Sequence, residues 1–220
     1  RSVRDDWGLG NDPIPKLAEL LEERGIKVLS LELDDIDGLA AKVRRKDRSS
    51  ARVIVIKQSS WSERKRFNLA HELGHMVLAP DPGVDEEKAA HRFAGAFLMP
   101  ADVLRSEVGA HRSSISIGEF AALKERFGVS IQALAYRCKD HRIIDRTAFA
   151  KLFRVFAERG WRTFPFAEPG TIEPAAEEPR RFERLCYRAL AENVIGEARA
   201  AELLNISVRE LDARLDQNLV

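Results

Sequence analysis

Two histidines in the stretch FNLAHELGHMVL are the residues of this sequence best placed to do chemistry. His71 and His75 lie four positions apart, and residues at this spacing share one face of a helix. Two imidazoles on one face can bind a single metal ion, and this arrangement is typical of zinc sites. The alternative is a half-buried helix in which both histidines are ordinary polar residues, so support must come from a third ligand.

Glu72 follows the first histidine and is expected to have a different role. One residue further along a helix is a rotation of about 100°, so this carboxylate can reach a water on the metal without binding the metal itself. Zinc lowers the pKa of the water and polarises a carbonyl, while the carboxylate takes the proton and delivers it to the leaving amine. The HExxH spacing therefore predicts zinc-dependent peptide hydrolysis with Glu72 as general base.

A catalytic zinc ion usually has three protein ligands and one open position. The next predicted helix, in EEKAAHRFAGAFLMP, offers Glu86, Glu87 and His91. Glu87 and His91 share a face by the same four-residue spacing. We predict Glu87 as the third ligand, with His91 as a partner of the ligands or a hydrogen-bond donor to the transition state. A three-histidine site with His91 as ligand is the alternative.

The helices that carry these residues follow from local signals. The capping-box spacing of Ser60 and Glu63 predicts the start of the first helix, which continues to about Leu78. The second helix is expected over about residues 85–98. Gly74, inside the first helix, either lets the backbone approach a neighbouring element or the substrate, or serves helix packing alone.

Before these helices, the pattern KLAELLEERG predicts a helix, and residues 26–33 and 52–58 are expected to be strands. The segment KVRRKDRSS between the strands is expected to be a solvated turn or hairpin arm. Residues 52–58 form either a sheet edge, to which an extended substrate could add as a strand, or an internal core strand. Further helices are expected at about residues 117–126, 130–139, 145–159, 181–192 and 196–216.

Two stretches, FAALKERFGVSIQALAYR and ARAAELLNISVRELDARL, both indicate a helix, a short turn and a second helix. Such helix-turn-helix-like pairs occur in DNA-binding proteins and as ordinary packing units. In the second stretch Arg199, Arg209 and Arg214 could contact phosphates. Five acidic residues in the same segment oppose this, so DNA binding is the alternative function and not the favoured one.

The composition of the 220 residues, 45% hydrophobic and 32% charged, predicts a soluble globular protein. The 36 basic and 35 acidic residues nearly cancel, so the net charge gives no general argument for nucleic-acid or membrane binding. Cys138 and Cys186 are isolated, which argues against a disulfide framework and a cysteine zinc site and fits the reducing cytoplasm. No apolar run reaches the length of about 18 residues that suggests a membrane span.

The two helical motifs together resemble the ImmA/IrrE metallopeptidases. The pattern of that family is roughly R-F-[T/S]-x-A-H-E-[LI]-[GS]-H, followed by E-x-x-A-[N/D]-x-F-A-x-x-L-L-M-P. The resemblance covers about residues 10–140 and favours Glu87 over Glu86 as the third ligand. Asn68 and His91 depart from the pattern, at positions that usually hold a hydroxyl residue and Asn or Asp. The matching residues are Arg66, Phe67, Ala70, His71, Glu72, Leu73, Gly74, His75, Glu87, Ala90, Phe93, Ala94, Leu98, Met99 and Pro100.

The resemblance implies an α+β fold with a minimal zincin-like core, in which a small sheet packs on the HExxH helix and helical segments follow. The expected division has four parts. These are a metallopeptidase core at residues 1–110, a helix-turn-helix-like extension at 111–160, a Pro-rich linker at 161–180 and a C-terminal helical, helix-turn-helix-like segment at 181–220.

The resemblance also implies a cytoplasmic zinc endopeptidase. Its partner would be a helix-turn-helix transcriptional repressor, cleaved to release gene expression in a phage, mobile-element or stress response, and Zn²⁺ would be the cofactor. A DNA-binding regulator and a metal-sensing pseudoenzyme are the alternatives, and Glu72 argues against the latter because a structural site needs no general base. Candidates for an oxyanion donor are Tyr136, Tyr187, His111 and His141.

Overall fold

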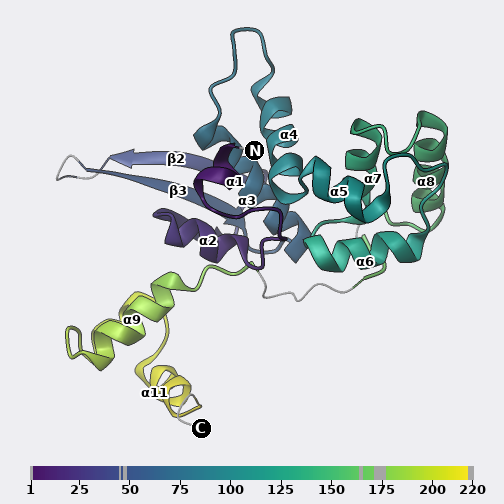
Figure 1. The fold of residues 1–220 in the computed structure, drawn as a ribbon. Helices are drawn as coiled ribbons and strands as arrows, with labels where there is room; N and C mark the ends of the chain where they lie inside the picture. Colours follow the sequence, from purple (N-terminus) through teal and green to yellow (C-terminus); the bar gives the residue numbers. More distant parts are fainter. Residues whose placement is uncertain (1, 45, 47–48, 164–165, 171–176, 218–220) are drawn as a thin grey trace. The chain divides into compact units, whose positions relative to one another are not determined.

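The computed structural model of the chain describes two compact units, one within Arg1–Glu178 and one within Pro179–Val220 (Figure 1). The first unit holds the sheet and both motif helices, whereas the regular structure in the described part of the second, residues 179–217, is helical. The residues that the structure describes are 2–44, 46, 49–163, 166–170 and 177–217.

The sheet has three strands, β1 (Ile26–Leu31), β2 (Gly38–Arg44) and β3 (Ser50–Lys57), in the order β1-β3-β2. β3 runs parallel to β1 and antiparallel to β2. Because β3 pairs on both sides, the hypothesis that residues 52–58 form an edge for substrate is wrong. The strands at the edges are β1 and β2, and the exposed and small residues of β2 give little of the alternation that marks a strand in sequence.

The motif helices are α3 (Ser62–Val77) and α4 (Glu86–Leu98), and α3 packs against α4 and the sheet. The capping box predicted from Ser60 is wrong: α3 begins at Ser62, and no side chain caps it. The ion pair of Glu63 with Lys124, at 2.6 Å, explains why the Glu63 carboxylate does not turn back to the helix start. By contrast, Asp85 caps α4 by accepting from the Lys88 N–H at 3.0 Å.

In the first unit, the helices after α4 share one hydrophobic core with the sheet and α3. Phe120, Phe127 and Phe156 are fully buried in one cluster with residues of the sheet and of α3. A capping box starts α6 (Ile117–Phe127), and Gly128, at φ 66°, ends it in the left-handed conformation that suits glycine. The other helices of this unit are α1 (Ser2–Asp6), α2 (Leu17–Glu23), α5 (Ala101–Val108), α6 (Ile117–Phe127), α7 (Ile131–Asp140) and α8 (Arg146–Glu158).

The second unit consists of α9 (Arg181–Ala191), α10 (Glu197–Leu204) and α11 (Val208–Gln217). The single helix expected over residues 196–216 is wrong, because Asn205 is left-handed at φ 54° and ends α10. The other prediction for this region, a helix, a short turn and a second helix in ARAAELLNISVRELDARL, is confirmed by α10 and α11. Its buried core contains Ala200, Ala201 and Leu211.

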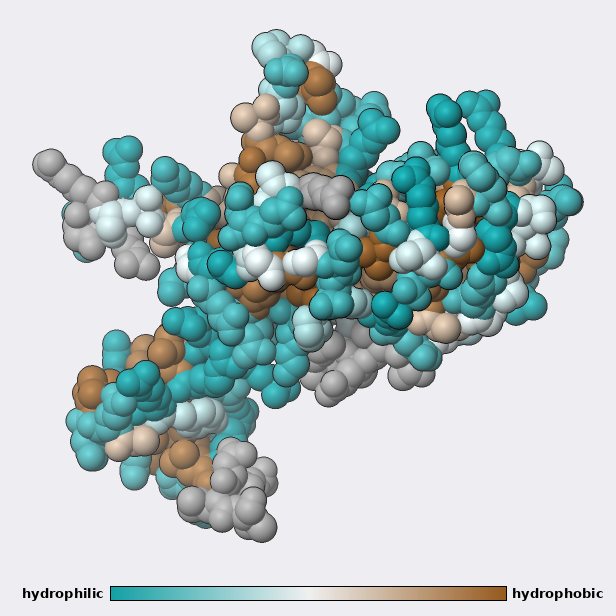
Figure 2. Space-filling model, viewed as in Figure 1, coloured by the Kyte–Doolittle hydropathy of each residue, from teal (hydrophilic) through white to brown (hydrophobic). Residues whose placement is uncertain are grey.

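The α+β fold class is confirmed, with a small sheet on the motif helix and helical segments after it. Figure 2 shows a largely hydrophilic face on which hydrophobic residues appear in small separate areas. Among the described residues, no helix combines the length and the apolar character needed to cross a membrane.

Candidate metal centre

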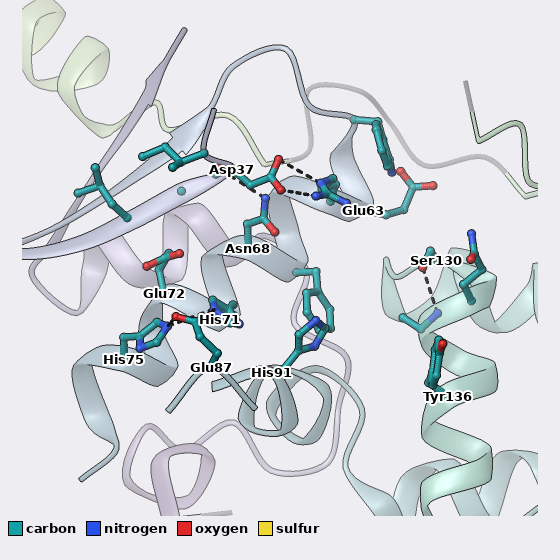
Figure 3. A pocket seen from close by; sticks show the side chains of 18 of the residues that line it. Asp37, Glu63, Asn68, His71, Glu72, His75, Glu87, His91, Ser130 and Tyr136 are labelled. Carbon is teal, nitrogen blue, oxygen red and sulfur yellow. Dashed lines mark hydrogen bonds and ion pairs between the residues drawn. The ribbon is translucent and has the colours of Figure 1, made fainter. Parts of the chain in front are cut away.

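Side chains of α3 and α4 bring three donor groups together (Figure 3). His71 Nε2 lies 3.2 Å from one carboxylate oxygen of Glu87, and His75 Nε2 lies 3.3 Å from the other. The two Nε2 atoms are 3.1 Å apart. The structure thus assembles the three residues that the spacing predicts as ligands.

The separations suit zinc. Ligand atoms at about 2.0–2.2 Å from a tetrahedral ion lie about 3.3–3.5 Å from one another, close to the observed distances. Burial lowers the pKa of His71, and His75 lowers it further, whereas Glu87 opposes the shift. A low pKa keeps the imidazole neutral, which is the form that binds a metal. Two imidazoles and one carboxylate are also a common set of protein ligands for catalytic zinc.

Gly74 allows the two ligand helices to approach closely. A Cβ at this position would lie 3.1 Å from Ala90 Cα and 3.1 Å from Phe93 Cδ1, and both belong to α4. Of the two roles predicted for Gly74, the structure therefore shows close packing on a neighbouring helix. With α3 and α4 this close, His71 and His75 lie 3.2 and 3.3 Å from the Glu87 carboxylate oxygens.

Glu72 lies beside the three donors, and only 8% of its surface is exposed. Burial raises the pKa of its carboxyl, His75 opposes this shift, and Glu87 adds to it. Gly38, the first residue of β2, makes room for this carboxylate, because a Cβ there would lie 3.3 Å from Glu72 Oε1. Sequence reasoning missed Gly38: it follows an acidic loop and looks like a turn residue, and its contact spans 34 positions of the chain.

His91 lies next to the donor group but is not part of it. Its ring stacks on Phe67, with 4.8 Å between centroids, and its centroid is 5.6 Å from that of His71. Among the described residues, the group of donors close enough to share an ion contains Glu87 and not His91. This geometry agrees with a role for His91 beside the ligands and gives no support to the three-histidine alternative.

These residues open into a cleft of about 1040 Å³. Figure 3 shows His71, His75 and Glu87 on one side and Tyr136, from α7, on the other. Of the four candidate oxyanion donors, Tyr136 lines the cleft, whereas His111 lines a separate cavity, Tyr187 belongs to the second unit and His141 is not among the residues that line the cleft. The walls are formed by residues 36–40, α3, α4, α7 and the segment that contains Phe166 and Glu168.

On another side of α3 lies a buried ion pair. The Arg66 guanidinium donates to the Glu177 carboxylate and to the Ile14 carbonyl, and Glu177 also accepts from the Ala18 N–H at 3.0 Å. Burial raises the pKa of Glu177, and Arg66 opposes this shift. Gly128 completes the contact, because a Cβ there would lie 2.9 Å from Arg66 Nε. The arginine that precedes the motif therefore has a structural partner far along the chain.

A search of curated proteins gives no match to this chain. Among solved structures, a Mycobacterium tuberculosis transcriptional regulator is similar, with 24% identity and a TM-score of 0.38. The alignment covers 55% of this chain and 38% of the regulator, so this chain matches well under half of the length of the regulator. The family model described as the IrrE N-terminal-like domain, Peptidase_M78, matches residues 21–139. That span exceeds half of the chain and includes both motif helices, so the chain belongs to the IrrE N-terminal-like peptidase family.

Proposed function

We propose that this protein is a zinc-dependent endopeptidase. The observation that carries the proposal is the position of Glu72, a largely buried carboxylate in the same cleft as three converging metal donors. A site that only stores or senses metal needs the donors but has no use for this neighbouring base. Membership of a peptidase family supports the same conclusion.

His71, His75 and Glu87 would hold the ion, which would polarise the scissile carbonyl and make water more acidic. Glu72 would accept a proton from the attacking water as the oxygen bonds to the carbonyl carbon. The same carboxyl would then give its proton to the nitrogen as the C–N bond breaks, releasing a carboxylate and an amine. The raised pKa of Glu72 favours this second step because it makes the protonated form easier to reach.

The edge strand β2 is suited to orient the peptide. Gly38, Leu39 and Ala40 line the cleft, and β2 pairs with β3 on its other side. An extended segment can add to such an edge through backbone hydrogen bonds, whatever its side chains. Residues 52–58, the other candidate for strand addition, lie mostly in β3 and pair on both sides, so we propose that the substrate adds to β2.

The proposed substrate is a helix-turn-helix transcriptional repressor, cleaved to release gene expression in the cytoplasm. The support is the family to which residues 21–139 belong. An extended, backbone-directed mode of binding requires that the repressor present an unfolded or loosely folded segment to the cleft.

The decisive experiment compares the wild-type protein with Glu72→Gln. Both should bind close to one zinc ion per chain, while the variant should cleave about 10²- to 10⁴-fold more slowly, since it lacks the general base. Zinc content is measured by atomic absorption, and cleavage by incubation with a helix-turn-helix repressor from the same genome. Loss of zinc from Glu72→Gln would make Glu72 a ligand, and a wild-type protein without zinc would exclude the proposed enzyme.

DNA binding by the second unit has less support. Arg214 forms ion pairs with Glu210 and Glu183, and Arg199 forms one with Glu202. These carboxylates compete with DNA phosphates for the two arginines. A salt-dependent gel shift with the full chain tests the alternative: tight binding that weakens steeply with salt would favour it.

A further inference from the structure

Aromatic and basic side chains form a surface patch on α7 and α8, outside the metal centre. Tyr136 packs against Phe149 and Phe153 with centroid distances of 5.1 and 5.0 Å, and the two phenylalanines are 4.3 Å apart. Lys139 Nζ lies 4.5 Å from the Phe149 centroid, and Arg162 Cζ lies 5.6 Å from that of Phe153. These five residues are called the aromatic–basic patch.

The patch is accessible to solvent. Tyr136 is 49% exposed, although its ring is large and mostly apolar, and both phenylalanines are only partly buried. Leaving such rings in contact with water sacrifices hydrophobic stabilisation that full burial would provide. Exposed aromatic residues of this kind are enriched where proteins bind partners.

The charge around the patch differs from that of the rest of the chain. Residues 131–163 contain eight Lys and Arg against three Asp and Glu, whereas the remaining residues contain 28 basic and 32 acidic ones. The nearly neutral total therefore conceals a positively charged region on α7 and α8. A positive surface attracts an acidic partner and disfavours a basic one.

The patch is continuous with the catalytic cleft. Tyr136 belongs to both, because it lines the cleft opposite the metal centre and packs in the patch through the same ring (Figure 3). A polypeptide that occupies the cleft can thus continue along α7 onto Phe149 and Phe153. We propose that the aromatic–basic patch is an exosite for an acidic segment of the protein substrate that also carries aromatic or other apolar residues.

Single-stranded nucleic acid is the other ligand that a basic surface with aromatic rings can bind, through base stacking. Stacking needs open ring faces. Here Lys139 lies within 5.3 Å of the Tyr136 centroid as well as over Phe149, and Arg162 lies near the Phe153 ring. Cations held near the rings compete with bases for them, whereas carboxylates can pair with the cations from outside. The geometry favours an acidic peptide.

The exosite rests on the proposed peptidase function but is tested by binding alone. The full zinc-loaded chain, carrying Glu72→Gln to prevent cleavage, is titrated against two fluorescent peptides of equal length and equal Phe and Leu content. One peptide carries Asp and Glu, the other Lys and Arg. We expect the acidic peptide to bind about tenfold more tightly, and Lys139→Glu to remove this preference.

Lys151→Glu is the matched control. It makes the same change of charge on α8, but position 151 is two residues from both Phe149 and Phe153 and therefore points to the opposite helix face. Lys151→Glu should change the affinity for the acidic peptide by less than about twofold. The affinity of Lys139→Gln should lie between those of the wild type and Lys139→Glu. Thermal unfolding confirms that each variant is folded.

Equal binding of the two peptides would overturn the exosite, as would an equal loss in Lys139→Glu and Lys151→Glu. Tighter binding of a single-stranded oligonucleotide, lost in Lys139→Glu, would assign the patch to nucleic acid instead. Failure of the peptidase proposal is recognised separately, by a wild-type protein that holds zinc and cleaves nothing. The two proposals can therefore fail independently.

Discussion

On each of two sides of α3, basic side chains of the helix contact a glutamate from elsewhere in the chain. The two glutamates differ in their exposure to solvent. Glu177, bound to Arg66, has 1% of its side chain exposed, whereas Glu87, bound to His71 and His75, has 76% exposed. The first site is completed by a cation that is part of the protein. The second faces the cleft and would be completed by a metal ion from solution. One helix thus carries a buried ion pair on one side and the candidate metal centre on the other.

The difference in exposure between Glu177 and Glu87 determines how much the loss of each contact should cost in stability. A buried ion pair is costly to break, because the charge that remains is still buried and has lost its partner. An exposed carboxylate is solvated with or without a metal, so its removal disturbs the fold little. Substitutions on one side of α3 should therefore change the free energy of unfolding, and those on the other should change metal affinity.

Arg66→Met should have the largest effect on stability. It leaves the Glu177 carboxylate without its cation in a buried position, and we expect a loss of about 3–5 kcal/mol in the free energy of unfolding. Chemical denaturation with urea measures this loss.

The double variant Arg66→Met with Glu177→Gln is the control. The amide oxygen of glutamine can still accept from the Ala18 N–H, and no buried charge remains. We expect the double variant to recover much of the stability lost by Arg66→Met. If it is as unstable as the single variant, the buried charge is not the cause.

Glu87→Ala should lower zinc affinity by at least about a hundredfold, because four ligands share about 10–16 kcal/mol of binding free energy in structural zinc sites. The stability of the metal-free protein should change by less than about 0.5 kcal/mol, since Glu87 is exposed. Competition with a chromogenic chelator measures the affinity.

His91→Ala is the comparison variant for this site. Its ring contacts His71 and Phe67 without belonging to the donor group, so its loss should cost about tenfold in zinc affinity. A larger loss for His91→Ala than for Glu87→Ala would favour the three-histidine site.

Gly74→Ala should have the smallest effect. The added methyl group meets α4 backbone at 3.1 Å, and the cost of overpacking, about 1–3 kcal/mol, exceeds the gain in helix propensity of about 1 kcal/mol. We expect a net loss of about 1 kcal/mol, measured by thermal unfolding, together with weaker zinc binding. Gly118→Ala is the control: this helical glycine has open space around it, so the same substitution should stabilise slightly. Equal gains in both variants would contradict the packing role.

The parts of the site that depend on local spacing were predictable from the sequence. The four-residue step between His71 and His75 places both on one helix face whatever the helix packs against. Asp85 before EEKAAHRF likewise predicts the start of α4 through local capping. Identification of Glu87 needed its place in a second motif, because its distance from the histidines depends on how two helices pack.

The parts that depend on contacts between distant residues were not predictable. Gly38 leaves space for the Glu72 side chain although the two residues are 34 positions apart, and Glu177 reaches Arg66 across 111 positions. Neither residue has a neighbouring sequence that distinguishes it from a turn glycine or a surface glutamate. The sheet order had the same difficulty, since nothing in the local pattern of β2 and β3 indicates which strand forms the edge.

The position of the buried Glu177 also bears on where the chain can be shortened. Glu177 and the neighbouring Glu178, which pairs with Lys65, end the first unit immediately before Pro179. A recombinant fragment that stops after residue 178 would keep both carboxylates in place, whereas one that stops at the end of α8 would leave Arg66 buried without an acidic partner. The boundary of a minimal stable fragment is therefore set by two glutamates that lie about 80 residues beyond α4.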